Sequence, residues 1–253
     1  MRASLSGARS AVSADRYALL NSCSTLRNVC THYSPRHTDF SIDIRTLTPC
    51  RTFAQGSGPA GVPGRVPGRT VAIMNMSFRR ISASDADSLI RFLTSEDWPF
   101  HVVSQVDRET AGQWVTEGRF ESEENRSFWV VDDGAAVGLV RLMDLGDATP
   151  LFDLRLRAAD RGRGVGAVAV AWLTRYLFEE FPDVRRIEGT TRQDNRAMRR
   201  VFVRCGYAKE AHYRDAWPSS GGEVHDAVGY AVLRRDWLSG EVTAPQWNDE
   251  PCE

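Results

Sequence analysis

The chain has 253 residues, of which 42% are hydrophobic and 26% charged, and its formal net charge is −1 at pH 7. This balance is ordinary for a globular protein, and no apolar run reaches the roughly 18 residues of a membrane span. The five cysteines are widely spaced, without a CxxC pair or nearby paired histidines, which argues against a disulfide framework and a zinc site. We therefore expect a cytoplasmic protein with no metal and no membrane partner.

The first 75 residues differ from the rest in composition. Residues 1–73 contain nine arginines, no lysine and three acidic residues, and they end in the linker GSGPAGVPGRVPGR. Such a linker cannot join a packed core, so residues 1–75 are expected to form a disordered extension. Two options stay open: a native segment such as a transit peptide, or translation from an upstream start, since Met74 and Met76 precede the patterned sequence. The remaining chain is net acidic, which disfavours a nucleic-acid partner.

Patterned sequence begins with FRRI (residues 78–81), a predicted strand. Residues 84–98 place apolar side chains on one helical face, with Ser84 as the predicted N-cap, and residues 107–118 predict a second helix. Two β-rich runs over residues 127–145 surround Asp133-Gly134, which indicates a hairpin. PLFDLRL (150–156) predicts a further strand, with Leu154 and Leu156 on one face and Asp153 on the other.

A glycine-rich stretch, RGRGVGA (161–167), then leads into an apolar helical pattern. RRIEGTT (185–191) predicts a strand, and DNRAMRRVFVRCG (194–206) predicts a helix that ends at Gly206. Residues 207–217 and 225–237 predict two antiparallel strands. This order predicts one domain over residues 76–240, α/β in class, with a mixed sheet and helices on both faces. Residues 241–253 are expected to be a flexible tail.

Gly162, Gly164 and Gly166 lie between a strand and a helix, as in loops that bind phosphate. A triphosphate loop is excluded because no Gly-Lys-Ser/Thr follows. The spacing also satisfies the dinucleotide motif, with Ala167 at its last position and Glu188 on the next strand. However, residues 157–160 separate the strand from the loop, and hairpins surround the motif where parallel repeats would be required. The dinucleotide hypothesis is therefore disfavoured.

Coenzyme A requires a strand edge for its pantetheine arm, free amides for its diphosphate, and a second helix beside its thiol. PLFDLRL, RGRGVGA and DNRAMRRVF supply these in order. The helix dipole and the side chains of Arg161 and Arg163 add positive potential at the loop. The sequence therefore favours coenzyme A over a dinucleotide.

At this point the chain resembles the GNAT superfamily of N-acetyltransferases, whose signature Arg/Gln-x-x-Gly-x-Gly/Ala is matched by Arg161, Gly164 and Gly166. The spacing of four later residues resembles the branch that includes the ribosomal-protein N-terminal acetyltransferases: Glu188, Asn195, Gly206 and Tyr207. The resemblance covers roughly residues 78–237. It implies a GNAT-like acyl-CoA N-acyltransferase fold and transfer of acetyl from acetyl-CoA to a primary amine, on a small molecule or a protein N-terminus.

The resemblance also implies roles for individual residues. Backbone amides near Leu154 and Leu156 would line the thioester, and Asn195 would bind the pantetheine end. The implied cofactor-binding set is Leu154, Leu156, Arg161, Gly162, Arg163, Gly164, Val165, Gly166, Ala167 and Asn195. Asn195 also belongs to the candidate catalytic residues.

Three carboxylates on predicted strands are candidates for the general base: Asp153, Glu188 and Asp226. Glu188, acting through a water, is the leading candidate because it matches the family spacing, and the alternative is a carboxylate paired with neighbouring arginines. Asp153 is expected to be structural or to contact the substrate. Three histidines, His101, His212 and His225, are expected at the surface or at strand edges.

Two departures from the family pattern bear on activity. Phe202 stands where many members have a tyrosine that acts as general acid, and Met198 replaces a small or hydroxylated residue. A catalytically silent coenzyme A-binding domain therefore remains an alternative to an enzyme.

The acceptor is expected near TSEDWPFH (94–101). Trp98 and Phe100, beside acidic Glu96 and Asp97, would suit a cationic amine with an apolar body, and Asp226 is a further candidate contact. The alternative is a helix end capped by buried aromatics. A homodimer is left open.

Overall fold

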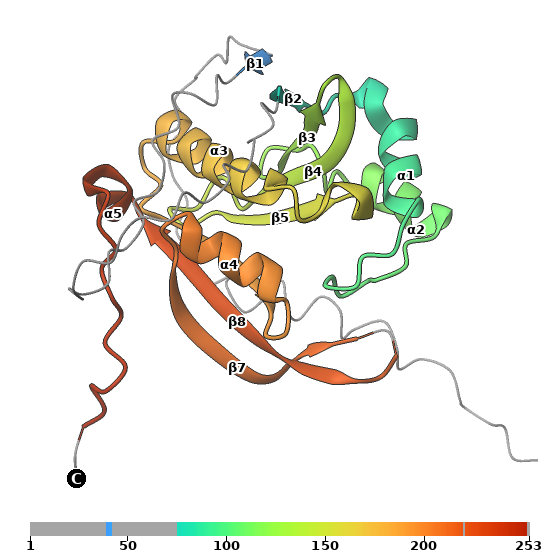
Figure 1. Cartoon of the computed structure of the whole chain (residues 1–253). Helices are drawn as coiled ribbons and strands as arrows, with labels where there is room; N and C mark the ends of the chain where they lie inside the picture. The colour runs from blue at the N-terminus through green and yellow to red at the C-terminus, as the bar shows by residue number, and fades with distance from the viewer. Residues whose placement is uncertain (1–38, 42–74, 220, 252–253) are drawn as a thin grey trace, which may run out of the picture. The chain divides into compact units, whose positions relative to one another are not determined.

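The computed structural model describes residues 39–41, 75–219 and 221–251 (Figure 1). The predicted extension lies outside this range except for Asn75 and the short strand β1 (Asp39–Ser41). The other strands are β2 (Met76–Arg80), β3 (Arg126–Asp132), β4 (Ala135–Met143), β5 (Leu151–Leu156), β6 (Arg186–Arg192), β7 (Ala208–Pro218) and β8 (Val224–Leu233). The helices are α1 (Ala86–Thr94), α2 (Arg108–Thr116), α3 (Val165–Glu180), α4 (Arg196–Arg204) and α5 (Arg234–Ser239), with 3-10 turns η2 (Ala83–Asp85) and η3 (Ala158–Asp160).

The strands form one mixed sheet in the order β1-β2-β3-β4-β5-β6-β8-β7. Neighbouring strands are antiparallel except β5 and β6, which are parallel. Asp133 and Gly134 connect β3 to β4 with φ angles of 47° and 81°, as a type I′ turn requires. The predicted α/β class, the β3–β4 hairpin and the antiparallel β7–β8 pair are confirmed.

Helices cover both faces of the sheet, as predicted (Figure 1). On one face, Trp172 of α3 stacks on Phe78 of β2, with ring centroids 4.1 Å apart. On the other face, Phe92 of α1 meets Trp129 of β3 edge-on at 5.4 Å. β3 serves both layers, because Phe128 joins the α3 side and Trp129 the α1 side. This explains the unbroken apolar run FWVV (128–131) at its centre.

The first helical segment starts earlier than predicted. Ser82, and not Ser84, is the N-cap, because the Asp85 carboxylate accepts hydrogen bonds from the Ser82 backbone N–H at 3.0 Å and from Arg79 at 2.8 Å. This capping box begins the turn η2, from which α1 continues. The spacing of Ser82 and Asp85 is itself the local signature of a capping box, and the prediction of Ser84 overlooked it.

The last predicted strand, residues 225–237, is too long. β8 stops at Leu233 and α5 follows. Arg234 donates hydrogen bonds to the backbone carbonyls of Phe178, Phe181 and Val184, which lie 50 or more positions earlier in the chain. These bonds hold the chain at the corner where β8 ends and α5 begins. No local sequence pattern predicts them, because the partners of Arg234 are distant in the chain.

Candidate active site

β5 and β6 diverge soon after they meet. Among the described residues, the registered pairing between them joins Leu151 to Glu188 alone, and the Glu188 N–H donates to the Pro150 carbonyl at 3.1 Å. On its other side β5 is paired with β4 as far as Leu156. The part of β5 beyond Leu151 therefore presents a strand edge toward a gap, where a peptide-like arm can form backbone hydrogen bonds.

Phe202 of α4 packs over the two strands at this gap. A Cβ atom added to Gly189 of β6 would lie 2.6 Å from the Phe202 ring and 3.0 Å from the ring of Phe152 on β5. Phe202 is 1% exposed and stacks on Tyr230 of β8, with centroids 4.7 Å apart. Its ring therefore has a packing role at the position where the resemblance implies a tyrosine acid.

The glycine loop connects β5 to the N-terminus of α3. Gly162 and Gly164 have φ angles of 77° and 97°, the left-handed region that glycine adopts without steric cost. The Ala167 N–H donates to the Gly164 carbonyl at 3.0 Å, which closes the first turn of α3. The N–H groups of residues 162–166 have no backbone acceptor within the described part of the chain. Together with the positive end of the α3 dipole, they can receive an anion such as a diphosphate.

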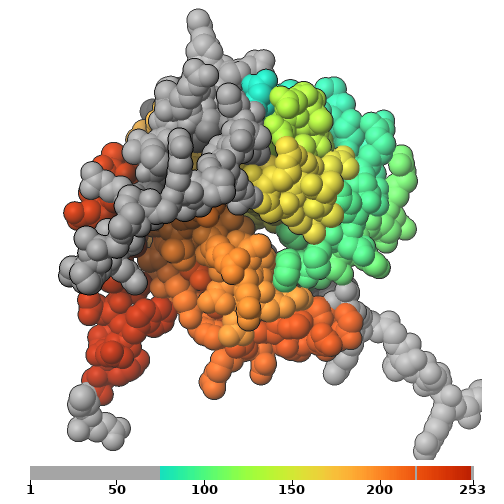
Figure 2. All heavy atoms as spheres, in the orientation of Figure 1, coloured from blue at the N-terminus to red at the C-terminus, as the bar shows by residue number. Residues whose placement is uncertain are grey.

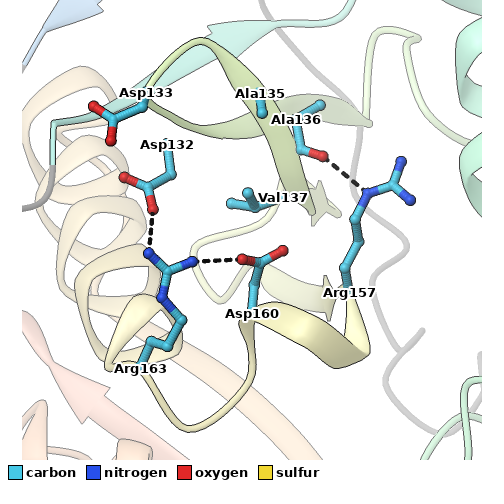
Figure 3. Close-up of a pocket in the computed structure, with 8 residues that line it drawn as sticks. All are labelled: Asp132, Asp133, Ala135, Ala136, Val137, Arg157, Asp160 and Arg163. Atoms are coloured by element: carbon cyan, nitrogen blue, oxygen red, sulfur yellow. Dashed lines mark hydrogen bonds and ion pairs between the residues drawn. The ribbon is translucent and has the colours of Figure 1, made fainter.

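Both arginines of this loop already contact carboxylates. The Arg161 guanidinium lies 3.9 Å from Glu96, while Arg163 binds Asp160 at 2.6 Å and Asp132 at 3.0 Å (Figure 3). These carboxylates offset much of the positive potential that the two arginines would otherwise create. The backbone amides are therefore the groups of this loop that are best placed to bind an anion.

Asn195 is the N-cap of α4. Its Oδ1 accepts a hydrogen bond from the Met198 N–H at 3.2 Å, and its Nδ2 donates to Thr191 Oγ1 at 3.0 Å. The side chain therefore fixes the turn between β6 and α4. Its predicted bond to a pantetheine arm stays a prediction and would use the second Nδ2 hydrogen.

Asp153 lies on the face of β5 opposite Leu154, toward the α1–α2 loop (residues 95–107). Its Oδ1 is 2.8 Å from His101 Nε2, and its Oδ2 is 3.2 Å from Arg155 Nε. Burial opposes ionisation, but the nearby charges of His101 and Arg155, and the hydrogen bond with His101, outweigh it and hold the pKa of Asp153 well below its usual range. A carboxylate so stabilised is a poor proton acceptor, which fits the structural or substrate-contacting role better than the role of base.

Glu188 lies at the closed end of the gap, where β5 and β6 are still paired. Its Oε1 is 2.6 Å from Arg186 Nη2, which also binds Glu210 of β7 at 2.6 Å. The Glu188 side chain is 24% exposed, so water reaches it. The ion pair agrees with the alternative of an arginine-paired carboxylate, and the role as base stays a prediction.

The α1–α2 loop touches both strands that border the gap. Its Glu96 accepts a hydrogen bond from the Ala158 N–H, at the start of η3, at 2.6 Å. Its Pro99 carbonyl accepts one from Arg192 at the end of β6 at 3.3 Å. In Figure 2 this loop lies directly against the segment that follows β5. An acceptor that reaches the gap from this side must therefore pass the α1–α2 loop.

The two predicted aromatic contacts lie in different environments. Trp98 is 1% exposed and its Nε1 donates to the Leu93 carbonyl at 2.8 Å, which agrees with the alternative of a buried aromatic at a helix end. Phe100 is half-buried beneath the Arg192 guanidinium, 4.9 Å from its ring centroid. Phe100 is thus the better placed of the two for an acceptor.

Asp226 lies on β8 beside the end of β6, because its backbone carbonyl accepts the Gln193 N–H at 2.9 Å. Its carboxylate accepts hydrogen bonds from the Asp215 N–H at 3.0 Å and from His212 at 2.7 Å, and these bonds lower its pKa. The side chain is committed to the β7–β8 hairpin. Its predicted contact with the acceptor stays a prediction.

Three residues contribute to this region in ways that the sequence did not predict. Glu96 was considered only for the acceptor and Asp132 was not considered at all. His101 was expected at the surface or at a strand edge, yet its Nδ1 is buried and has no hydrogen-bond partner among the described residues. His101 lies 52 positions from its partner Asp153, and no sequence signal connects them.

Within the described ranges, no three or more His, Cys, Asp or Glu side chains are grouped so as to hold a metal ion. In the same ranges, no helix has the length and apolarity that crossing a bilayer demands.

Comparison of the sequence and the structure with known proteins indicates one family. Residues 75–208 match the model of the acetyltransferase (GNAT) domain family. No match to a curated protein reaches significance. Many solved structures share the fold at low sequence identity.

One of these structures is a spermidine N-acetyltransferase SpeG chimera from Vibrio cholerae and hSSAT: 15% identity, 64% of this chain, 98% of that chain, TM-score 0.56. Another is RimL, a ribosomal L7/L12 alpha-N-protein acetyltransferase in complex with coenzyme A. It is 16% identical, the match covers 62% of this chain and 93% of that chain, and the TM-score is 0.53. A third is Mycobacterium smegmatis RimJ in complex with CoA-disulfide. It is 18% identical, the match covers 66% of this chain and 91% of that chain, and the TM-score is 0.52. Identities this low show the fold alone, so the resemblance to one branch stays a prediction.

Proposed function

The chain belongs to the GNAT acetyltransferase family, and from this premise we propose that it transfers acetyl from acetyl-CoA to a primary amine by direct attack in a ternary complex. The observation that carries the proposal is the row of N–H groups at residues 162–166, which lack a backbone acceptor and stand at the N-terminus of α3 beside the unpaired edge of β5. Diphosphate and pantetheine require these two features side by side.

In the proposed reaction the lone pair of a neutral amine attacks the thioester carbonyl carbon. A C–N bond forms, the C–S bond breaks, the nitrogen loses one proton, and the departing thiolate gains one. Backbone N–H groups of β5 near Leu154 and Leu156 are placed to stabilise the oxyanion. Phe202 has no proton to give, so we assign protonation of the thiolate to water.

The acceptor must first become neutral. A lysine-like amine with a pKa near 10.4 costs roughly 4.6 kcal/mol to deprotonate at pH 7, whereas an α-amine near pKa 8 costs about 1.4 kcal/mol. Glu188, acting through a water, is our proposed base, and Asp153 with Phe100 is proposed to contact the acceptor. An α-amine requires less help from this base than an alkylamine does, which favours peptide N-termini as acceptors.

Transfer of labelled acetyl from acetyl-CoA to a panel of peptide N-termini, polyamines and aminoglycosides tests the proposal. We expect turnover with at least one peptide N-terminus. Glu188→Gln should lower kcat by about 100-fold if the carboxylate is the base. Glu210→Gln is the matched control, because it removes the other carboxylate of Arg186, and it should leave kcat unchanged. Equal losses in both variants would show that Glu188 is structural.

A second candidate function, a silent coenzyme A-binding domain, is favoured by the ring at Phe202 and the ion pair of Glu188. Its signature is tight acetyl-CoA binding without turnover of any amine in the panel. A dinucleotide oxidoreductase is disfavoured by the sheet, in which β5 and β6 are the parallel pair and all other pairs are antiparallel. A thermal shift with NAD and none with acetyl-CoA would reverse that order.

A further inference from the structure

The segment from Arg157 to Arg163 carries the start of the glycine loop, and the β3–β4 hairpin holds it at both ends. At the first end, the Arg157 N–H donates to the Val137 carbonyl at 2.9 Å, and its Nε donates to the Ala136 carbonyl at 3.0 Å. At the second end, Arg163 Nη2 binds Asp132 Oδ2 at 3.0 Å. Figure 3 shows the contacts of the Arg157 and Arg163 side chains around an open pocket between the hairpin and the loop.

Asp132 is a fixed anchor. It is the last residue of β3, and its backbone is in register with Met76 of β2 on one side and Ala135 of β4 on the other. It is 6% exposed, so its carboxylate has little freedom of its own. Arg163, in contrast, is half exposed and reaches from the glycine loop to this anchor.

The charge of Asp132 is unexpected so close to a loop that receives a diphosphate. If Arg163 bound the phosphates directly, Asp132 and Asp160 would weaken binding, because they compete for the guanidinium and repel the ligand. The contacts give Arg163 a different task. It ties the two positive-φ glycines, Gly162 and Gly164, to the hairpin, and so limits the backbone freedom that the loop would lose on binding.

We propose that Asp132 is a positioning residue for acetyl-CoA: through Arg163 it holds the glycine loop in the conformation whose N–H groups receive the diphosphate. This rests on the proposed function. Charge repulsion alone would make acetyl-CoA bind more tightly once a carboxylate near its phosphates is removed. The proposal predicts the opposite, that removing the Asp132 charge weakens binding.

The test compares two neighbouring aspartates in the full chain. Asp132→Asn removes the anchor, whereas Asp133→Asn removes the same charge from an exposed residue that lines the same pocket. Asp133 has φ 47°, which asparagine also adopts, so the control keeps the turn. By calorimetry we expect Asp132→Asn to weaken acetyl-CoA binding roughly tenfold, and Asp133→Asn to leave it unchanged or slightly tighter. Equal or tighter binding in both variants overturns the proposal.

A second variant covers the case that Asp132→Asn disturbs the fold. Arg163→Gln alters a half-exposed side chain and should speed amide hydrogen exchange at Ala167 and Val168, whose N–H groups donate to the Gly164 carbonyl, in the ligand-free protein. A direct phosphate ligand would leave that exchange unchanged, and such a result overturns the proposal. In the double variant, the loss of affinity should not exceed the loss in either single variant. If the wild-type protein binds no acetyl-CoA, the proposed function itself fails, which is a distinct result.

Discussion

Gly164 decides the direction of the first amides of α3. It is the N-cap of the helix, its φ is 97°, and a Cβ atom added there would meet nothing within 4 Å. The position therefore demands glycine for its backbone conformation and not for lack of space. The proposed diphosphate would lie in the open space next to the Gly164 Cα atom.

Replacement of Gly164 by alanine should weaken acetyl-CoA binding about tenfold, because a left-handed residue with a Cβ costs about 1–2 kcal/mol and the loop relaxes away from its binding conformation. Titration calorimetry measures the effect. Gly112→Ala is the control: Gly112 lies inside α2 with open space around it, so this change should keep affinity and raise stability by up to about 1 kcal/mol. Unchanged affinity in Gly164→Ala would contradict the role of the loop.

Asp85 is a residue on which the stability of the α1 side depends. Its carboxylate accepts hydrogen bonds from Arg79, Ser82 and the indole of Trp129, and it is 8% exposed. The bond from Arg79, with those from Ser82 and Trp129, outweighs burial and lowers the pKa of Asp85 far below its usual range.

Asp85→Asn should therefore destabilise the protein by about 2 kcal/mol at pH 7. Since the pKa is lower in the folded state, the stabilisation is complete above the unfolded pKa, near 3.9, and is lost as the pH falls below it. The difference in Tm between wild type and variant should thus shrink below about pH 4. Asp87→Asn, in the exposed first turn of α1, should change Tm little, and a pH-independent difference for Asp85→Asn would refute the linkage.

At the scale of elements, the gap between β5 and β6 is the feature that makes a site. α4 contributes Phe202 over Gly189, and α3 contributes Gly166, whose added Cβ would be 3.5 Å from Leu156 and 3.6 Å from Val201. The contacts at Gly189 are closer than a Cβ atom tolerates, so glycine there lets α4 approach β6, whereas a Cβ atom at Gly166 would make ordinary van der Waals contacts.

Gly189→Ala should cost about 1–3 kcal/mol, because its new methyl group would overlap the buried Phe202 ring. Phe202→Leu removes the ring atoms concerned and leaves a partial cavity. In the double variant the two losses should not add, and chemical denaturation of all four proteins measures the coupling. Strictly additive losses would show that the two residues do not constrain each other.

At the scale of the whole molecule, the candidate site lies at the middle of the sheet, away from the edge that β1 forms. β1 pairs with β2 through Asp39, Phe40 and Ser41, and β2, β3 and β4 separate it from β5. The far edge, β7, lies beyond β8 and β6. Loss of an edge strand should therefore affect stability before it affects binding.

A protein that begins at Met74 tests this separation. It lacks β1, yet its acetyl-CoA affinity should stay within about twofold of the full chain, since distant sites contribute independently. Calorimetry and thermal unfolding on both proteins supply the comparison. A large loss of affinity would show that residues 1–73 take part in the site.

Much of this arrangement could be predicted from the sequence. The order of strands and helices from β2 to β8, the hairpin at Asp133-Gly134 and the helix end at Gly206 were all predicted, because each depends on short-range periodicity or on a residue with special φ preferences. The switch from β8 to α5 was not, because it depends on Arg234 and carbonyls far away in the chain.

The candidate site likewise has a part that was predicted from the sequence and a part that was not. The glycine loop was found from its motif, whereas the partners of its arginines were not. Glu96, Asp132 and His101 lie on the α1–α2 loop and on β3, and they meet the β5–α3 region only after folding. A motif reports local backbone geometry and cannot report which charges surround it.

By itself, the sequence determined the α/β class, the order of elements from β2 to β8 and the place of the glycine loop, because these follow from periodicity and from glycine at positive φ. Only the tertiary structure decided how charge is distributed around that loop, which strand edge is left unpaired, and that Phe202 packs over the gap. Electrostatics and close packing act between residues that are near in space, and distance along the chain does not encode that nearness.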